Sequence, residues 1–112
     1  MSATPIPIPE LTLEAVKSSE EIIVRCSGRI TSSTSGTLQT KVRELIPETK
    51  CIVLDLTDVN YIDSSGLGAL VSVYLSAKRR QCELKLINLS QRLQELFRIT
   101  KLSVRGSRRK LL

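Results

Sequence analysis

One carboxylate, two hydroxyls and two glycines follow one another in the stretch DSSGLG, from Asp63 to Gly68. Asp63 can accept hydrogen bonds, and the hydroxyl of Ser64 or Ser65 can take up a phosphoryl group. Gly66 and Gly68 keep the stretch free of side-chain bulk, so that another backbone or a phosphate can approach closely. A Ser-His-Asp hydrolase is excluded, because the sequence contains no histidine and the spacing is not G-x-S-x-G. No lysine stands close enough to form a Ser–Lys pair.

Three interpretations of this stretch remain open from residue types alone. In the first, Asp63 or a serine caps a helix, and the glycines let that helix pack closely on a sheet. In the second, a helix N-terminus binds the phosphate of a nucleotide, although the motif G-x-x-x-x-G-K-[ST] is absent. In the third, one serine is the substrate of a kinase. A phosphoryl group adds about −1.5 to −2 charges beside Asp63, which would repel a docked partner.

The elements on either side of the stretch can be predicted from hydrophobic patterning. Residues 50–59, KCIVLDLTDV, form a nearly continuous β-branched run, typical of a central strand covered on both faces. A helix is predicted after it, ending at the cations of residues 78–80. Its expected apolar stripe consists of Leu67, Leu70, Val71 and Tyr74. The stretch DSSGLG therefore lies at the carboxyl end of a strand, where function gathers in open α/β sheets.

The first part of the chain predicts a hairpin and a helix. Residues 11–16 and 21–28 alternate like strands, with Gly28 ending the second one. Residues 29–36 are rich in Ser and Thr, which favours a loop or helix cap. A helix then ends at Pro47. Its apolar positions are Leu38, Val42, Leu45 and Ile46.

The last part predicts a strand at residues 82–89, a helix at 90–102 and a short strand near 102–105. Ser90 is the expected N-cap of the helix, whose apolar face would carry Leu93, Leu96 and Phe97. The order ββαβαβα implies parallel pairing with an antiparallel edge. The predicted fold class is therefore α/β, a small mixed sheet of about four to five strands flanked by helices.

Length and composition narrow the function classes. A chain of 112 residues predicts one domain. We expect an extended arm at 1–10, the domain at 11–104 and a basic tail at 105–112. No apolar run approaches the roughly 20 residues of a membrane span, and the N-terminus MSATPIPIPELTLE lacks the features of a secretory signal. We therefore expect a cytoplasmic protein.

Charge and cysteine usage add two further expectations. The net charge of +6 comes mostly from the tail, where Lys101, Arg105, Arg108, Arg109 and Lys110 occur with no acid after Glu95. With aromatic residues at 3%, stacking on nucleic-acid bases is not expected, so no direct DNA binding is predicted. The 3 cysteines are scattered inside apolar segments. We expect them to be reduced and buried, with no metal site and no cofactor.

The segment from Cys51 to Leu102 resembles the STAS domain, specifically the bacterial anti-sigma factor antagonists, and the resemblance extends over residues 11–102. It rests on the strand VLDL, on D-S-S-G-L-G-x-L, on L-x-L-x-x-L and on L-F-x-x-T-x-L. The resemblance implies a non-enzymatic protein that binds an anti-sigma factor serine kinase and releases its sigma factor. The kinase would phosphorylate the serine directly after the aspartate, here Ser64, and so end the complex. A serine phosphatase would restore binding.

The chain departs from that family pattern after its second strand. The family usually has Gly-Glu-Leu-Asp there, whereas this chain has Gly28, Arg29, Ile30 and Thr31. Arg29 could change the charge of the partner surface or pair with a phosphate on Ser64. The residues expected to bind the partner are Asp63, Ser64, Ser65, Gly66, Leu67, Gly68, Arg29 and Thr31. The alternative is a STAS module bound to a transport ATPase or a larger signalling complex, with little or no phosphorylation.

Overall fold

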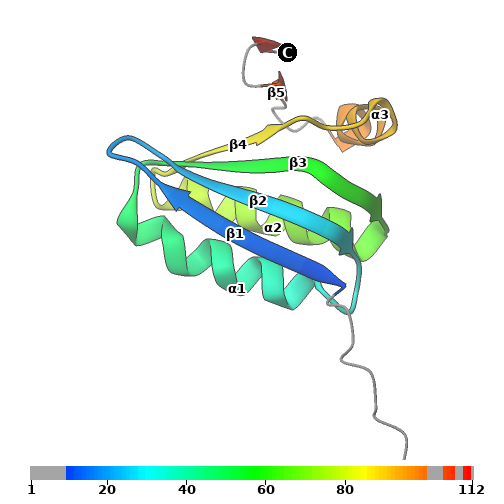
Figure 1. Cartoon of the computed structure of the whole chain (residues 1–112), viewed down its shortest axis with the longest axis horizontal. Helices are drawn as coiled ribbons and strands as arrows, with labels where there is room; N and C mark the ends of the chain where they lie inside the picture. Colours follow the sequence, from blue (N-terminus) through cyan, green and yellow to red (C-terminus); the bar gives the residue numbers. More distant parts are fainter. Residues whose placement is uncertain (1–9, 101–104, 108–109, 112) are drawn as a thin grey trace, which may run out of the picture.

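Four strands form one mixed sheet in the order β1-β2-β3-β4 (Figure 1). The computed structural model describes residues 10–100, 105–107 and 110–111. β1 pairs antiparallel with β2, and β2–β3 and β3–β4 are parallel pairs. The predicted mixed sheet with an antiparallel edge is confirmed. The strand bounds are β1 Leu11–Lys17, β2 Ile22–Ile30, β3 Cys51–Ile62 and β4 Glu83–Ile87.

Two helices cover one face of this sheet, side by side and running in the same direction (Figure 1). They are α1, Ser35–Leu45, and α2, Ser64–Arg79. A 3₁₀ turn that contains Pro47 follows α1, which confirms the prediction that the helix ends at this proline. Both helices begin at the sheet edge where β2 and β3 end, so the site stretch lies at that edge.

The chain after β4 forms α3, Gln91–Thr100, and two short strands. The predicted N-cap of α3 is confirmed, because the N–H of Leu93 donates to Ser90 Oγ at 3.2 Å. β5, Arg105–Ser107, pairs with β6, Lys110–Leu111, in a separate sheet. A strand thus begins at residue 105 inside the expected basic tail. Residues 101–104, and residues 1–9 of the arm expected at 1–10, lie outside the described residues.

The core lies between the sheet and the two helices, and β3 is buried on both faces. Ile52 and Leu54 point into this core and are fully buried. Val53 points to the opposite face, where it is equally buried and packs with Ile87. Since successive side chains of a strand point to opposite faces, burial of all three explains the continuous apolar run. The prediction of a central strand covered on both sides is confirmed.

The prediction that Gly28 ends the second strand is wrong. β2 continues to Ile30, with a register shift against β3 between Gly28 and Arg29. Gly28 has φ +118°, and a Cβ at this position would lie 2.1 Å from the carbonyl oxygen of Glu10. Glycine here allows an irregularity within a strand and a close backbone approach. β3 is also longer than expected and ends at Ile62.

The buried face of α2 differs from the predicted stripe. Leu70 is buried as expected, whereas Leu67, Val71 and Tyr74 are only partly buried. The stripe was predicted from large apolar side chains, but small residues let this helix approach the sheet closely. Its buried residues are Gly66, Ala69, Leu70, Val73 and Ala77.

All three cysteines are buried and form no disulfide, as the sequence predicts. Burial, with a smaller contribution from the negative charge of Asp55, raises the pKa of the Cys26 thiol to about 12. Because the thiolate is the reactive form of cysteine, Cys26 is a core residue without nucleophilic character.

Candidate functional site

The start of α2 is fixed to the ends of two strands by Asp63. Its side chain accepts a hydrogen bond from the N–H of Gly66 at 2.8 Å, which is an N-cap. Its own N–H donates to the carbonyl oxygen of Ile30 at 3.2 Å. The capping interpretation of the stretch is thus confirmed for Asp63. The capped turn holds Ser64 and Ser65 in a defined position beside the end of β2.

Gly66 brings the first turn of α2 into direct contact with β2. It is buried, and a Cβ added to it would lie 2.0 Å from the carbonyl oxygen of Ile30. A Cβ at Gly68 would meet nothing within 4 Å. The expected role in close helix–sheet packing therefore belongs to Gly66, whereas Gly68 leaves an open surface next to the serines.

Ser64 and Ser65 are both exposed at the N-terminus of α2. The first turn contains no acidic residue beyond the cap, and the unpaired N–H groups of a helix start carry about half a positive charge. A phosphoryl group is therefore tolerated here by the helix itself. The exposed hydroxyls can be reached by the active site of another protein.

Arg29 lies at the same end of the sheet as this site, but its side chain contacts a different residue. Its guanidinium carbon lies 4.7 Å from the centre of the Tyr61 ring, a cation–π contact between paired positions of β2 and β3. Its neighbour Ile30 is buried under the helices, so Arg29 points to the other face of the sheet. Within the part of the chain that the structure describes, this guanidinium contacts Tyr61 and makes no hydrogen bond to Ser64.

Thr31 is buried in the turn between β2 and α1. Its N–H donates to Thr34 Oγ1 at 2.9 Å, and Thr34 Oγ1 in turn donates to the carbonyl oxygen of Arg29 at 2.8 Å. The hydroxyl of Thr31 lies 3.0 Å from that of Ser33. Thr31 is therefore buried and shapes the turn, and its role in partner binding stays a prediction.

Two residues that the sequence did not single out complete this end of the molecule. Ile30 supplies the carbonyl oxygen that accepts a hydrogen bond from the N–H of Asp63 and that Gly66 packs against. Tyr61 remains 45% exposed, although it is a large aromatic residue. Tyr61 could have been noticed in the sequence, because it stands only two residues before Asp63. Ile30 gave none, because it acts through its backbone.

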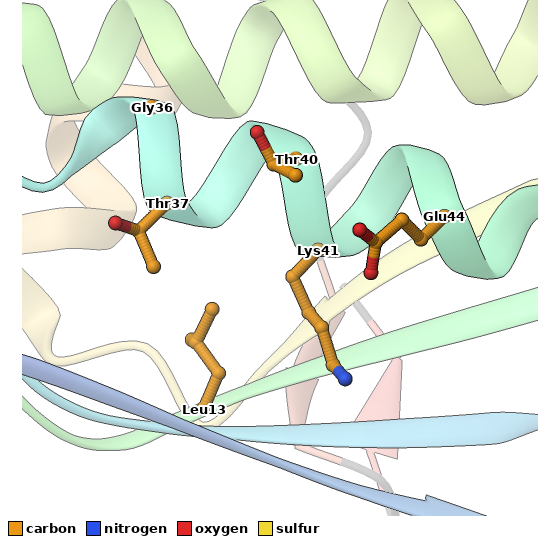
Figure 2. Close-up of a pocket in the computed structure, with 6 residues that line it drawn as sticks. All are labelled: Leu13, Gly36, Thr37, Thr40, Lys41 and Glu44. Atoms are coloured by element: carbon orange, nitrogen blue, oxygen red, sulfur yellow. The ribbon is translucent and has the colours of Figure 1, made fainter.

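A wide hollow of about 590 Å³ lies between β1 and α1 (Figure 2). It begins at the first turn of α1, near Gly36, and extends to Lys41 and Glu44 on the same helix, with Leu13 on the strand below. These side chains form no nucleophile–base pair. Among the residues that the structure describes, no group of three or more His, Cys, Asp or Glu could hold a metal ion. In the same ranges no helix combines the length and apolarity needed to cross a bilayer.

The comparisons with known proteins place this geometry in a family. The model of the STAS domain matches residues 12–105. The chain therefore belongs to the STAS domain family, as its motifs indicate. Among solved structures, the anti-sigma factor antagonist SpoIIAA in its unphosphorylated form has a TM-score of 0.66 at 19% identity, over 80% of this chain and 82% of that one. The predicted STAS fold is confirmed.

Two curated relatives carry the name anti-sigma-B factor antagonist. The protein of Bacillus subtilis (strain 168) is 34% identical over 90 residues, which is 80% of this chain and 83% of the relative. The protein of Listeria monocytogenes is 54% identical over 50 residues, 45% of this chain and 44% of the relative. This second match thus spans less than half of the Listeria protein.

Proposed function

We propose that this chain is an anti-sigma factor antagonist whose binding is switched off by phosphorylation of Ser64. In this role it binds an anti-sigma factor that is a serine kinase, and so releases the sigma factor. A serine phosphatase reverses the modification. The protein supplies a hydroxyl and a docking surface, whereas ATP, metal and catalytic base belong to the kinase. It is not an enzyme, and it acts in the cytoplasm without contacting DNA.

The exposed hydroxyl of Ser64, directly after the capping residue Asp63, is the observation that carries this proposal. Its position is fixed by the contacts of Asp63 and Gly66 with the carbonyl group of Ile30 at the end of β2. The names of the relatives support the same role.

The switch follows from charge. A phosphoryl group adds about −1.5 to −2 charges next to the carboxylate of Asp63, in the middle of the proposed docking surface. A partner that fits the neutral hydroxyl must then desolvate a dianion or leave. A penalty of about 3 kcal/mol lowers the affinity roughly a hundredfold.

The proposed docking surface includes residues with different functions. Ser64, Ser65, Gly68 and the partly buried Leu67 are accessible from α2. Arg29 is exposed at the end of β2, on the sheet face opposite the helices, and would contact only a partner that reaches around this end of the sheet. The remaining residues of the predicted set shape this surface from below or cap the helix. They are Asp63, Gly66 and Thr31.

Affinity capture from a lysate of the source bacterium tests this function. The wild-type chain, Ser64→Asp and the neutral control Ser64→Ala serve as baits, and retained proteins are identified by mass spectrometry. We expect a kinase of the anti-sigma type on the wild type and on Ser64→Ala, and its loss from Ser64→Asp, because only the aspartate imitates the added charge.

Two results would contradict the proposal. A kinase retained equally by all three baits would show that charge at residue 64 does not control binding. Retention of a transport ATPase in place of a kinase would favour the alternative STAS module, in which DSSGLG serves only as a structural junction.

A further inference from the structure

The opposite end of the helical layer contains a hollow lined by three arginines. It lies between the C-terminal ends of α1 and α2 and has a volume of about 240 Å³. α2 has 16 residues, so this end lies about 24 Å from Ser64 along the helix. The lining residues are Arg43, Ile46, Ser76, Arg79 and Arg80.

The positive charge of this hollow is not neutralised by carboxylates. Among the residues that the structure describes, the ion pair found is that of Lys17 with Glu48, and none includes an arginine of the hollow. Arg43 Nη2 donates to Ser72 Oγ at 3.1 Å, which holds one guanidinium across the gap between the helices. All three arginines are exposed, and the residues that line the hollow include no carboxylate.

Helix ends alone do not account for this arrangement. A cation in the last turn stabilises its own helix, which covers Arg43 on α1 and Arg79 on α2. That effect does not require residues of both helices to line one hollow, and it does not explain why Arg80, the C-cap of α2, lines the hollow too. A hollow lined by several arginines can recognise a multiply charged anion, because each guanidinium group offers paired N–H donors to phosphate oxygens.

We propose that this hollow binds the diphosphate group of a small molecule. The volume is below the roughly 300 Å³ at which pockets for drug-sized ligands begin, so it suits a phosphate group better than a whole cofactor. Ser76 adds a hydroxyl and the buried Ile46 an apolar floor. The site is separate from the proposed phosphorylation switch, since none of its residues belongs to the start of α2.

Titration of the full-length chain with inorganic pyrophosphate tests this proposal. Binding is followed by calorimetry and by backbone amide shifts in NMR spectra. We expect saturable one-to-one binding, with shifts at the C-terminal ends of α1 and α2. Arg43→Gln and Arg79→Gln should each weaken binding about tenfold, because each removes a charged donor from a shared site. Glutamine keeps helix propensity close to that of arginine, so the fold should persist.

Arg92→Gln on α3 is the matched control, and it should leave the affinity unchanged. Ser64→Asp should also bind pyrophosphate like the wild type, which separates this test from that of the proposed function. The proposal is overturned if pyrophosphate does not saturate, if the shifts fall only on residues 105–112, or if Arg92→Gln weakens binding as much as Arg79→Gln. If polyglutamate binds the hollow and pyrophosphate does not, the proposal is overturned too, in favour of a protein partner with an acidic segment.

Discussion

Ser64 and Ser65 carry the same side chain and are both exposed, but they differ in distance from the cap. Ser64 is the first residue of α2 and adjoins Asp63, whereas Ser65 is one residue further into the turn. Because successive residues of a helix differ by about 100° in direction, the two hydroxyls face different parts of a docked kinase. A kinase that binds in one orientation therefore reaches one of them.

Replacing each serine by alanine tests this assignment. The kinase recovered by affinity capture should transfer phosphate from ATP to Ser65→Ala as to the wild type, and should not modify Ser64→Ala. Phosphate incorporation, located by mass spectrometry of peptides, is the measurement. Both residues are exposed, so we expect each variant to change the unfolding free energy by no more than about 0.5 kcal/mol. Loss of phosphate from Ser65→Ala alone would show that Ser65 is the acceptor.

At the scale of elements, the contact between α2 and β2 is the feature that positions the site. Gly66→Ala would place a Cβ 2.0 Å from the carbonyl oxygen of Ile30, so the helix start must move away from the sheet. We expect a loss of about 1–3 kcal/mol of unfolding free energy, measured by urea denaturation. Because the cap at Asp63 shares this contact, kinase binding should weaken as well.

Gly68→Ala is the matched control for this prediction. A Cβ there meets nothing within 4 Å, and alanine is a better helix former than glycine. We expect this variant to be as stable as the wild type or up to about 1 kcal/mol more stable. Equal destabilisation by both substitutions would mean that the contact with Ile30 has no special importance.

β3 and β4 are connected by a polar contact at Asp55. Its carboxylate accepts hydrogen bonds from the N–H and hydroxyl of Thr57 and, at 3.0 Å, from Asn88 just after β4. Burial acts to raise the pKa of Asp55, but these hydrogen bonds and the charge of Arg25 outweigh it and hold the pKa below its ordinary value of 3.8. The ionised form is therefore favoured by folding.

The sign of this pKa shift predicts a pH dependence. A carboxylate with a lowered pKa in the folded state stabilises the protein above pH 3.8, and this contribution is lost as the pH falls through the folded-state pKa. Asp55→Asn should be less stable than the wild type at pH 7, and the difference should shrink as the pH is lowered below 3.8. Urea denaturation over a series of pH values measures it. A difference independent of pH would show that the charge of Asp55 makes no contribution.

At the scale of the whole molecule, the fold could largely be predicted because its strands and helices follow simple hydrophobic patterns. The run CIVLDL requires burial on both faces, and the capping stretch with Asp63 marks the start of α2. The continuation of β2 through Gly28 could not be predicted, since a glycine can either end a strand or allow a bulge within it.

The site could be predicted in its residue types but not in its spatial arrangement. The pattern DSSGLG indicates a capped helix start and an exposed serine. Whether Arg29 lies near Ser64 depends on which face of β2 it occupies. The sequence predicts a loop after Gly28 and so assigns Arg29 no face, whereas in the structure β2 continues and its core face carries Val24, Cys26 and Ile30, which leaves Arg29 on the opposite face. The burial of Thr31 depends on hydrogen bonds within its turn, which no spacing rule reveals.

The two ends of the helical layer have opposite electrostatic character in this account. Modification at the N-terminal end of α2 adds negative charge beside Asp63, whereas the C-terminal ends of α1 and α2 contribute the arginine hollow. The two ends are joined by α2, which runs from Ser64 to Arg79 along the sheet. The state of Ser64 and the occupancy of the hollow can thus be measured separately on one chain.

The measurement that tests the central claim most directly is the affinity of the captured kinase for two forms of this chain. One form is unmodified, and the other is phosphorylated by the kinase itself, with the site confirmed as Ser64 by mass spectrometry. We predict that phosphorylation weakens binding about a hundredfold or more, as a penalty of about 3 kcal/mol requires. The same affinity for both forms would contradict the switch.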